Sequence, residues 1–220
     1  MINNEVEMKI REMKPFYVKD VIKNIFSWKE LEGIINFRPL LSAERFHIIN
    51  KKEYSWPVQN WLSDPNTYPA EIVQEELQYD AAYLSDMSRA NESINTICRK
   101  LELITGCPTD AHIYFCIAQE VQKTGFKVHW DWSHNLIVQV EGETNITVWN
   151  KTANDDDPRE IDTIEETPEF DIIMQPGDIC FVPIKHYHRA ISKTKRLSIS
   201  FPSAVFFQNP KQDRTWIKIT

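Results

Sequence analysis

The segment that decides the fold is Lys127-Val-His-Trp-Asp-Trp-Ser-His-Asn-Leu-Ile-Val-Gln-Val-Glu-Gly142, which joins two candidate metal ligands to an apolar strand. The ligands are His129 and Asp131, separated by one residue. Residues i and i+2 of a strand share a face, so we expect the imidazole and the carboxylate to point the same way and the indole of Trp130 to point the other way. This spacing predicts one half of a metal site.

A third candidate ligand, His188, lies five residues after the segment Gln175-Pro-Gly-Asp-Ile-Cys-Phe-Val-Pro183, which is typical of a turn followed by a strand. His134 and His186 lie close to these ligands in the sequence, and either could compete with them. Two imidazoles and one carboxylate on adjacent strands form a facial triad, which leaves coordination positions open on non-haem Fe(II).

The hydrophobic pattern divides the chain near residue 109. Apolar residues recur at helical spacing before this point, and the period changes to two after it. We therefore predict one domain over residues 1–220, with a mainly helical part over 1–108, a β core over 109–207 and a tail over 208–220. The predicted fold class is mainly β with N-terminal helices packed on the β core.

Two helices are expected near the N-terminus, after a polar lead-in over residues 1–14. The first runs from residue 18 to 28, where apolar residues are spaced for one helix face. The second runs from residue 28 to about 36. Ser27 and Glu30 have the spacing of a capping box, in which each side chain bonds a free backbone N–H of the other.

A longer helical pattern covers residues 72–84 and 94–104 and ends at Gly106, a residue type favoured just after a helix. Residues 118–125 are expected to form a loop near the mouth of the site. An aromatic cluster between the helical segments is expected to be core or, alternatively, one wall of a substrate pocket: Tyr54, Trp56 and Trp61.

The net charge is −7, and no run of lysine or arginine stands out. This argues against a nucleic-acid partner bound through phosphates. The N-terminus lacks the apolar run of a signal peptide, and no stretch is long and apolar enough to span a bilayer. Scattered cysteines without a CxxC motif indicate thiols in a reducing compartment, so we expect a cytoplasmic protein: Cys98, Cys107, Cys116 and Cys180.

The second half of the chain resembles the JmjC-like, cupin-type double-stranded β-helix (jelly-roll) oxygenases that use Fe(II) and 2-oxoglutarate. A lone His-x-Asp pair is a weak signal, but the same pair followed by an apolar strand, a Gly-Asp turn and a late histidine is much more specific. The matching pieces are His112-Ile-Tyr114, Gly125-Phe-Lys-Val-His-Trp-Asp131, Asn135-Leu-Ile-Val-Gln-Val-Glu-Gly142, and Pro176-Gly-Asp178 through Pro183 to His188.

The resemblance implies that His129, Asp131 and His188 hold the iron and are the catalytic centre. His188 is preferred over His186 because the family places the distal histidine five residues after the proline. Fe(II), 2-oxoglutarate as co-substrate and O2 are the implied cofactors, and the implied activity is hydroxylation coupled to formation of succinate and CO2. The expected substrate is a small molecule, an amino acid or a peptide; a homodimer is left open.

The family usually binds the distal carboxylate of 2-oxoglutarate with a lysine, and this sequence has Thr144 at that position. Arg196 and Ser198 resemble the Arg-x-Ser pair that other 2-oxoglutarate oxygenases carry on the last core strand, and an arginine can bind a carboxylate through two hydrogen bonds. For Arg196 the alternative is a surface residue in a charge run. The remaining candidate co-substrate contacts are Tyr114, His112 and Asn135.

Two other function classes remain open at this point. One is a cupin-like metalloenzyme, a dioxygenase or isomerase, that does not use 2-oxoglutarate; Thr144 is its best support. The other is a non-catalytic binding module on the same barrel. The three candidate ligands argue against this last class, because burying Asp131 without a partner would be costly.

Overall fold

The computed structural model describes residues 2–36, 45–49, 74–75, 77–78, 80–117 and 126–204. Its helices are α1 (Asn4–Arg11), α2 (Trp28–Ile35) and α4 (Glu92–Thr105). Its strands are β1 (Phe16–Val18), β2 (Phe46–Ile48), β3 (Ala82–Leu84), β4 (His112–Cys116), β5 (Val128–His129), β6 (Ser133–Glu141), β7 (Thr144–Thr152), β8 (Glu160–Ile161), β9 (Phe170–Met174), β10 (Ile179–Val182), β11 (His186–Ser192) and β12 (Arg196–Ala204).

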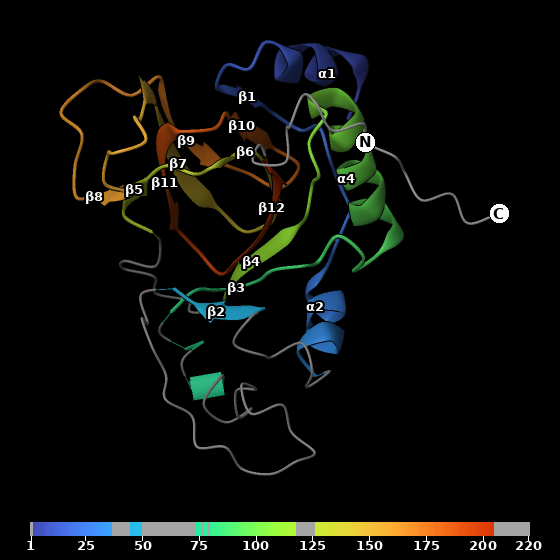
Figure 1. The fold of residues 1–220 in the computed structure, drawn as a ribbon. Helices are drawn as coiled ribbons and strands as arrows, with labels where there is room; N and C mark the ends of the chain where they lie inside the picture. Colours follow the sequence, from blue (N-terminus) through green and yellow to red (C-terminus); the bar gives the residue numbers. More distant parts are fainter. Residues whose placement is uncertain are drawn as a thin grey trace.

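The strands form two antiparallel sheets that enclose a barrel (Figure 1). One sheet has the order β1-β10-β6-β12-β4-β3-β2, and the other has the order β8-β5-β11-β7-β9. From β4 to β7 and again from β9 to β12, consecutive strands alternate between the sheets. This is the double-stranded β-helix that was predicted, and the mainly β fold class is confirmed.

The seven-stranded sheet packs its outer face on a large apolar core under the helices. Helix α4 lies along β12 and beside α1 (Figure 1). Alternation along β12 divides its side chains between two environments. Leu197, Ile199 and Phe201 are fully buried in the core, whereas Ser198 and Ser200 face the barrel interior. The described helices therefore stabilise the seven-stranded sheet directly.

Half of the predicted capping box is present at the start of α2: Ser27 caps the helix, and Glu30 bonds the Ser27 hydroxyl instead of its N–H. The Ser27 hydroxyl accepts a hydrogen bond from the Glu30 N–H at 3.3 Å and donates to the Glu30 carboxylate at 2.8 Å. At the end of α4, Gly106 adopts φ +70°, a left-handed conformation that costs glycine little. Both helix boundaries agree with those expected from the sequence.

The helix predicted over residues 18–28 does not form. Asp20 has a φ of +57°, and the N–H groups of Val21 and Ile22 both donate to the carbonyl of Gly177, at 2.8 and 3.0 Å. The apolar side chains of this segment still enter the core. Their spacing predicted correctly that these side chains are buried. The backbone N–H groups, however, donate to a distant turn and not to carbonyls within a helix.

Two further expectations are corrected. Tyr83 and Leu84 belong to strand β3, which pairs with β2 and β4 on its two sides, and not to a helix. The polar lead-in contains helix α1, whose Val6 and Ile10 are fully buried. The aromatic cluster at residues 54–61, the loop at 118–125 and the tail at 208–220 lie outside the described residues.

The barrel interior has an apolar end and a polar end. The apolar end is filled by a cluster of five buried side chains: Ile146, Val148, Met174, Cys180 and Val182. The four cysteines of the chain are all buried thiols. Within the part of the chain that the structure describes, no helix has the length and apolar character needed to cross a membrane.

Candidate metal centre and co-substrate cavity

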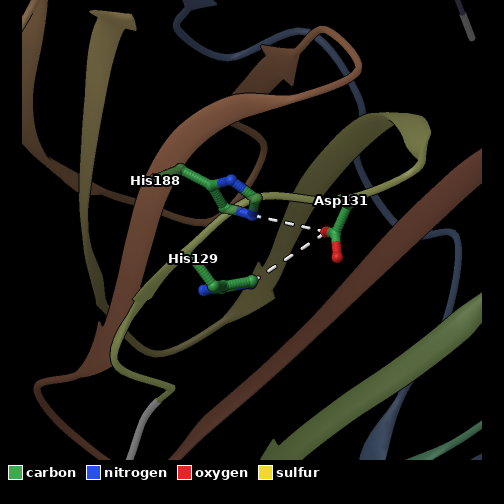
Figure 2. Close-up of side chains that lie close together, drawn as sticks. All are labelled: His129, Asp131 and His188. Atoms are coloured by element: carbon green, nitrogen blue, oxygen red, sulfur yellow. Dashed lines mark ion pairs between the residues drawn. The ribbon is translucent and has the colours of Figure 1, made fainter. Parts of the chain in front are cut away.

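The three candidate ligands converge at the polar end of the barrel (Figure 2). His129 ends β5 and lies directly opposite His188 of β11 in the sheet register. Asp131 follows two residues after β5, beyond the strand that was predicted to include it. Its Oδ2 lies 3.6 Å from Nε2 of His188 and 4.0 Å from Nε2 of His129. The potential ligand atoms all lie within 4.8 Å of one another.

Backbone carbonyls orient both imidazoles. Nδ1 of His129 lies 2.8 Å from the Lys127 carbonyl oxygen, and Nδ1 of His188 lies 3.0 Å from the His186 carbonyl oxygen. A carbonyl can only accept a hydrogen bond, so Nδ1 carries the proton in each ring. The Nε2 lone pairs therefore point to the centre, as in histidines that bind metals.

Two side chains hold the carboxylate of Asp131 in place. The Asn135 amide donates to Oδ2 at 2.8 Å, and the Arg159 guanidinium donates to Oδ1 at 3.0 Å. The Asp131 backbone carbonyl also accepts the Lys185 N–H at 2.8 Å. Both the side chain and the main chain of this candidate ligand are therefore fixed.

The electrostatic environment favours the forms that bind a cation. Burial, together with the neighbouring His129, lowers the pKa of His188 to about 4, so its imidazole is neutral at neutral pH. Burial alone would raise the pKa of Asp131, but the two imidazoles and the Arg159 guanidinium outweigh this effect and lower it. Neutral imidazole nitrogens and an ionised carboxylate are ligands that suit Fe(II). This donor set fits the metal that the sequence predicts.

The competing histidines lie elsewhere. Nδ1 of His134 accepts the Ile184 N–H at 3.1 Å, and the ring stacks on Phe181 on the core side of the sheet. Nδ1 of His186 lies 3.2 Å from the Ile184 carbonyl oxygen. Among the described residues, neither joins the group formed by His129, Asp131 and His188.

A cavity of about 800 Å³ extends from the three candidate ligands. Tyr83 stacks on Tyr114 with a centroid distance of 4.9 Å, and Phe126 lies 5.2 Å from the His129 ring. All the site residues predicted from the sequence line this cavity: His112, Tyr114, His129, Asp131, Asn135, Thr144, His188, Arg196 and Ser198. The structure thus brings together residues that are up to 86 positions apart (His112 to Ser198) in the chain.

Arg196 is buried inside the barrel and not part of an exposed charge run; only 3% of its surface is accessible. Its Nη1 donates to Oγ1 of Thr144 at 3.2 Å, across from the opposite sheet. Thr144 in turn donates to the Gln139 side chain at 2.8 Å. Thr144 is therefore a hydrogen-bond partner of the buried cation.

The turn between β6 and β7 positions Thr144. The Gln139 amide donates to the carbonyls of Glu141 and Gly142 at 2.8 and 3.1 Å. Gly142 has φ +69°, and a Cβ at this position would lie 2.0 Å from the Lys195 carbonyl oxygen. The Gln-x-Glu-Gly sequence is thus explained by one tight turn packed against the chain just before Arg196.

The cavity lining also includes residues that the sequence did not assign to the site, among them Tyr83, Phe126 and Arg159. Tyr83 falls in a segment predicted as a helix. Arg159 lies 28 positions from Asp131 in the sequence. No local pattern in the sequence relates it to the metal site.

Comparisons with known proteins agree with this architecture. A model of the JmjC domain matches residues 84–212. The chain is 22% identical over 206 residues to the bifunctional lysine-specific demethylase and histidyl-hydroxylase NO66 of Dictyostelium discoideum, covering 89% of this chain and 39% of that protein. It is 24% identical over 195 residues to the NO66 protein of Caenorhabditis elegans, covering 84% and 25%. The chain thus spans well under half the length of these relatives.

Solved structures share the fold. The ribosomal oxygenase YcfD of Escherichia coli in complex with cobalt and 2-oxoglutarate has a TM-score of 0.61 at 19% identity, covering 87% of this chain and 48% of that one. The complex with cobalt and succinic acid has a TM-score of 0.62, covering 92% and 52%. Because the JmjC model matches more than half of the chain, the protein belongs to the JmjC domain family of cupin-type 2-oxoglutarate oxygenases.

Proposed function

We propose that this protein is an Fe(II)- and 2-oxoglutarate-dependent hydroxylase that acts on a side chain of a protein or peptide. In this proposal His129, Asp131 and His188 hold the iron. Arg196 binds the distal carboxylate of 2-oxoglutarate with Thr144 and Ser198, and Tyr114, His112 and Asn135 line the co-substrate cavity. When bound, Fe(II) supplies the centre at which O2 oxidises 2-oxoglutarate to succinate and CO2 and the substrate gains an oxygen atom.

The observation that carries the proposal is the buried guanidinium of Arg196 on the same cavity as the three candidate ligands. Among the described residues no carboxylate pairs with it, and its Nε has no hydrogen-bond partner. Burial lowers its pKa to about 10, so it remains a cation at neutral pH. A buried cation without a counter-charge is costly, and a bound carboxylate would compensate that cost.

Thr144 is compatible with this assignment. The family position usually held by lysine here holds a threonine that accepts a hydrogen bond from Arg196. The cation therefore comes from β12 in the opposite sheet, and the threonine orients it. Burial raises the pKa of Tyr114, so its phenol stays protonated and can donate a hydrogen bond within the cavity.

The proposed substrate class is inferred from the names of the similar proteins. The NO66 proteins are named for demethylation of lysine and hydroxylation of histidine, and YcfD is named a ribosomal oxygenase. Both names refer to protein substrates. The aromatic wall of Tyr83, Tyr114 and Phe126 beside His129 could pack against an inserted side chain. The small-molecule and free amino-acid substrates considered above become alternative outcomes of the test.

The first experiment is an anaerobic titration of the Fe(II)-loaded protein with 2-oxoglutarate, followed by visible absorption. Bidentate chelation of Fe(II) by the 2-oxoacid is expected to give a weak charge-transfer band, and Arg196→Ala should require a much higher 2-oxoglutarate concentration to produce it. If iron binds but no band appears in the wild type, the protein is a cupin-like metalloenzyme that does not use 2-oxoglutarate.

A second measurement addresses the substrate. Succinate formation is followed with pools of histidine-containing and lysine-containing peptides and, separately, with free amino acids. Stimulation by peptides alone supports the proposed class. Stimulation by free amino acids alone would contradict it.

A further inference from the structure

A strap, defined as residues 153–169, connects β7 to β9 in the chain. It crosses the outer face of the five-stranded sheet. Its apolar residues Ala153, Ile161 and Ile164 pack with an aromatic group on that face. The group contains Trp130 and Trp149, both of which are almost fully buried. The strap therefore covers the five-stranded sheet, on which no helix of the described residues packs.

Two indole N–H groups hold the strap at separate points. Trp130 donates from Nε1 to the Pro158 carbonyl at 3.0 Å, and Trp149 donates from Nε1 to the Glu166 carbonyl at 2.9 Å. Strand β8 within the strap pairs with β5, which carries His129. The backbone of Arg159, next to the first anchor, accepts the Trp130 N–H at 3.3 Å. Arg159 is thus fixed at the edge of the metal centre.

The Arg159 side chain turns around this edge toward Asp131. Its Nη2 lies 3.0 Å from Oδ1 of Asp131, and its Nε donates to the Trp130 carbonyl at 3.4 Å. Oδ2, the other oxygen of the carboxylate, faces the two imidazoles. Arg159 therefore contacts the oxygen that lies away from the ring nitrogens.

We propose that Arg159 is a positioning residue of the metal centre: it holds Oδ1 of Asp131 and thereby presents Oδ2 to the metal. The inference rests on the metal site of the proposed function and extends it to a residue of the strap. Without the guanidinium only the Asn135 amide, which donates to Oδ2, still restrains the carboxylate, so its orientation is less firmly fixed. Outer-shell partners of this kind typically change metal affinity by about 10- to 100-fold.

The test is a calorimetric titration of the metal-free protein, residues 1–220, with Co(II) alone, without 2-oxoglutarate. Arg159→Ala is expected to weaken Co(II) binding about tenfold and to alter the visible absorption bands of the bound cobalt. Arg159→Lys should recover part of the affinity, because an ammonium can replace one hydrogen bond but not the planar fork. Guanidinium ion added at millimolar concentration should restore part of the affinity of Arg159→Ala.

Lys151→Ala is the matched control. Lys151 pairs with Glu166 of the strap at 2.6 Å, is exposed like Arg159, and does not line the cavity. Its removal loosens the strap without touching Asp131, and Co(II) affinity should stay within about twofold of the wild type.

Two outcomes overturn the inference. In the first, Arg159→Ala binds Co(II) as tightly and with the same spectrum as the wild type. In the second, Lys151→Ala weakens binding as much as Arg159→Ala, which would assign the effect to strap packing. If the wild type itself binds no Co(II), the proposed metal site fails, and this result is distinct from both.

Discussion

The two sheets of the barrel are stabilised in different ways. The seven-stranded sheet lies on a continuous apolar core with α1, α2 and α4. The five-stranded sheet carries His129 and His188 and is covered by the strap, which aromatic contacts, indole hydrogen bonds and exposed ion pairs hold in place. Burial of apolar surface dominates stability, whereas exposed ion pairs contribute little.

The large apolar core that stabilises the fold and the two candidate histidine ligands therefore belong to different sheets. The three candidate ligands come from separate positions in the chain, and a rigid core is needed to keep them together. The seven-stranded sheet supplies that rigidity, so the five-stranded sheet can carry side chains that do not contribute to stability. Polar side chains of the seven-stranded sheet, such as Asn135 and Ser198, also line the cavity. Arg196 is an exception among them because it brings a buried positive charge there.

The largest effect is expected from a substitution in the five-stranded sheet, on turnover and metal binding. His129→Ala should abolish turnover and reduce metal binding below detection, while the free energy of unfolding of the metal-free protein changes by less than about 1 kcal/mol, because the imidazole lines a cavity. Succinate formation, metal titration and urea unfolding measure the three quantities. His186→Ala, on the same sheet, should retain metal. Intact turnover in His129→Ala would refute the ligand assignment.

The reverse pattern is expected for the seven-stranded sheet. Phe201 is fully buried in the core on β12. Phe201→Ala should lower the free energy of unfolding by about 3–5 kcal/mol, through lost burial and the cavity that remains. Ile173→Ala is the control, because this residue of β9 is 48% exposed and should cost less than about 0.5 kcal/mol. If urea unfolding showed the same loss of free energy of unfolding in both variants, the claim that the seven-stranded sheet carries most of the stability would be contradicted.

Arg196→Ala tests the exception. Loss of a charged hydrogen-bond donor should raise the dissociation constant for 2-oxoglutarate about 10- to 100-fold. Metal affinity should remain close to that of the wild type, because among the described residues Arg196 bonds to Thr144 and makes no hydrogen bond or ion pair with the three candidate ligands. Anaerobic titration of the iron-loaded variant measures the first quantity, and Co(II) calorimetry measures the second. A variant that binds 2-oxoglutarate normally would place the anchor elsewhere.

The smallest expected effect is a pH dependence of the free energy of unfolding, caused by a histidine of the seven-stranded sheet. Burial and the nearby His186 lower the pKa of His134 in the folded state, and its Nδ1 must be unprotonated to accept the Ile184 N–H. The unfolded chain therefore binds a proton more readily, so stability is lost as the pH falls below about 6.5. Urea unfolding of the metal-free protein at several pH values should show this loss, and His134→Gln should reduce it. An unchanged slope in that variant would exclude His134 as a contributor.

Much of the β core was predictable because its signals are local. Alternation from residue 109 onward, the His-x-Asp pair and the Gly-Asp turn are read directly from neighbouring residues. The capping box at Ser27 and the end of α4 at Gly106 have the same local origin. The segment at 18–28 failed because helical spacing reports which side chains are buried and not where the backbone hydrogen bonds go.

The sequence by itself determined the mainly β fold class through its hydrophobic periodicity. It also singled out the three candidate ligands and six further cavity residues, because each lies in a short motif that resembles the JmjC-like family or other 2-oxoglutarate oxygenases. Only the tertiary structure decided that Arg196 is buried and bonded to Thr144 from the opposite sheet, and that Arg159 reaches Asp131. The physical reason is that these contacts join segments 28 to 52 residues apart, which meet only when two sheets close into a barrel and a strap packs on its outer face.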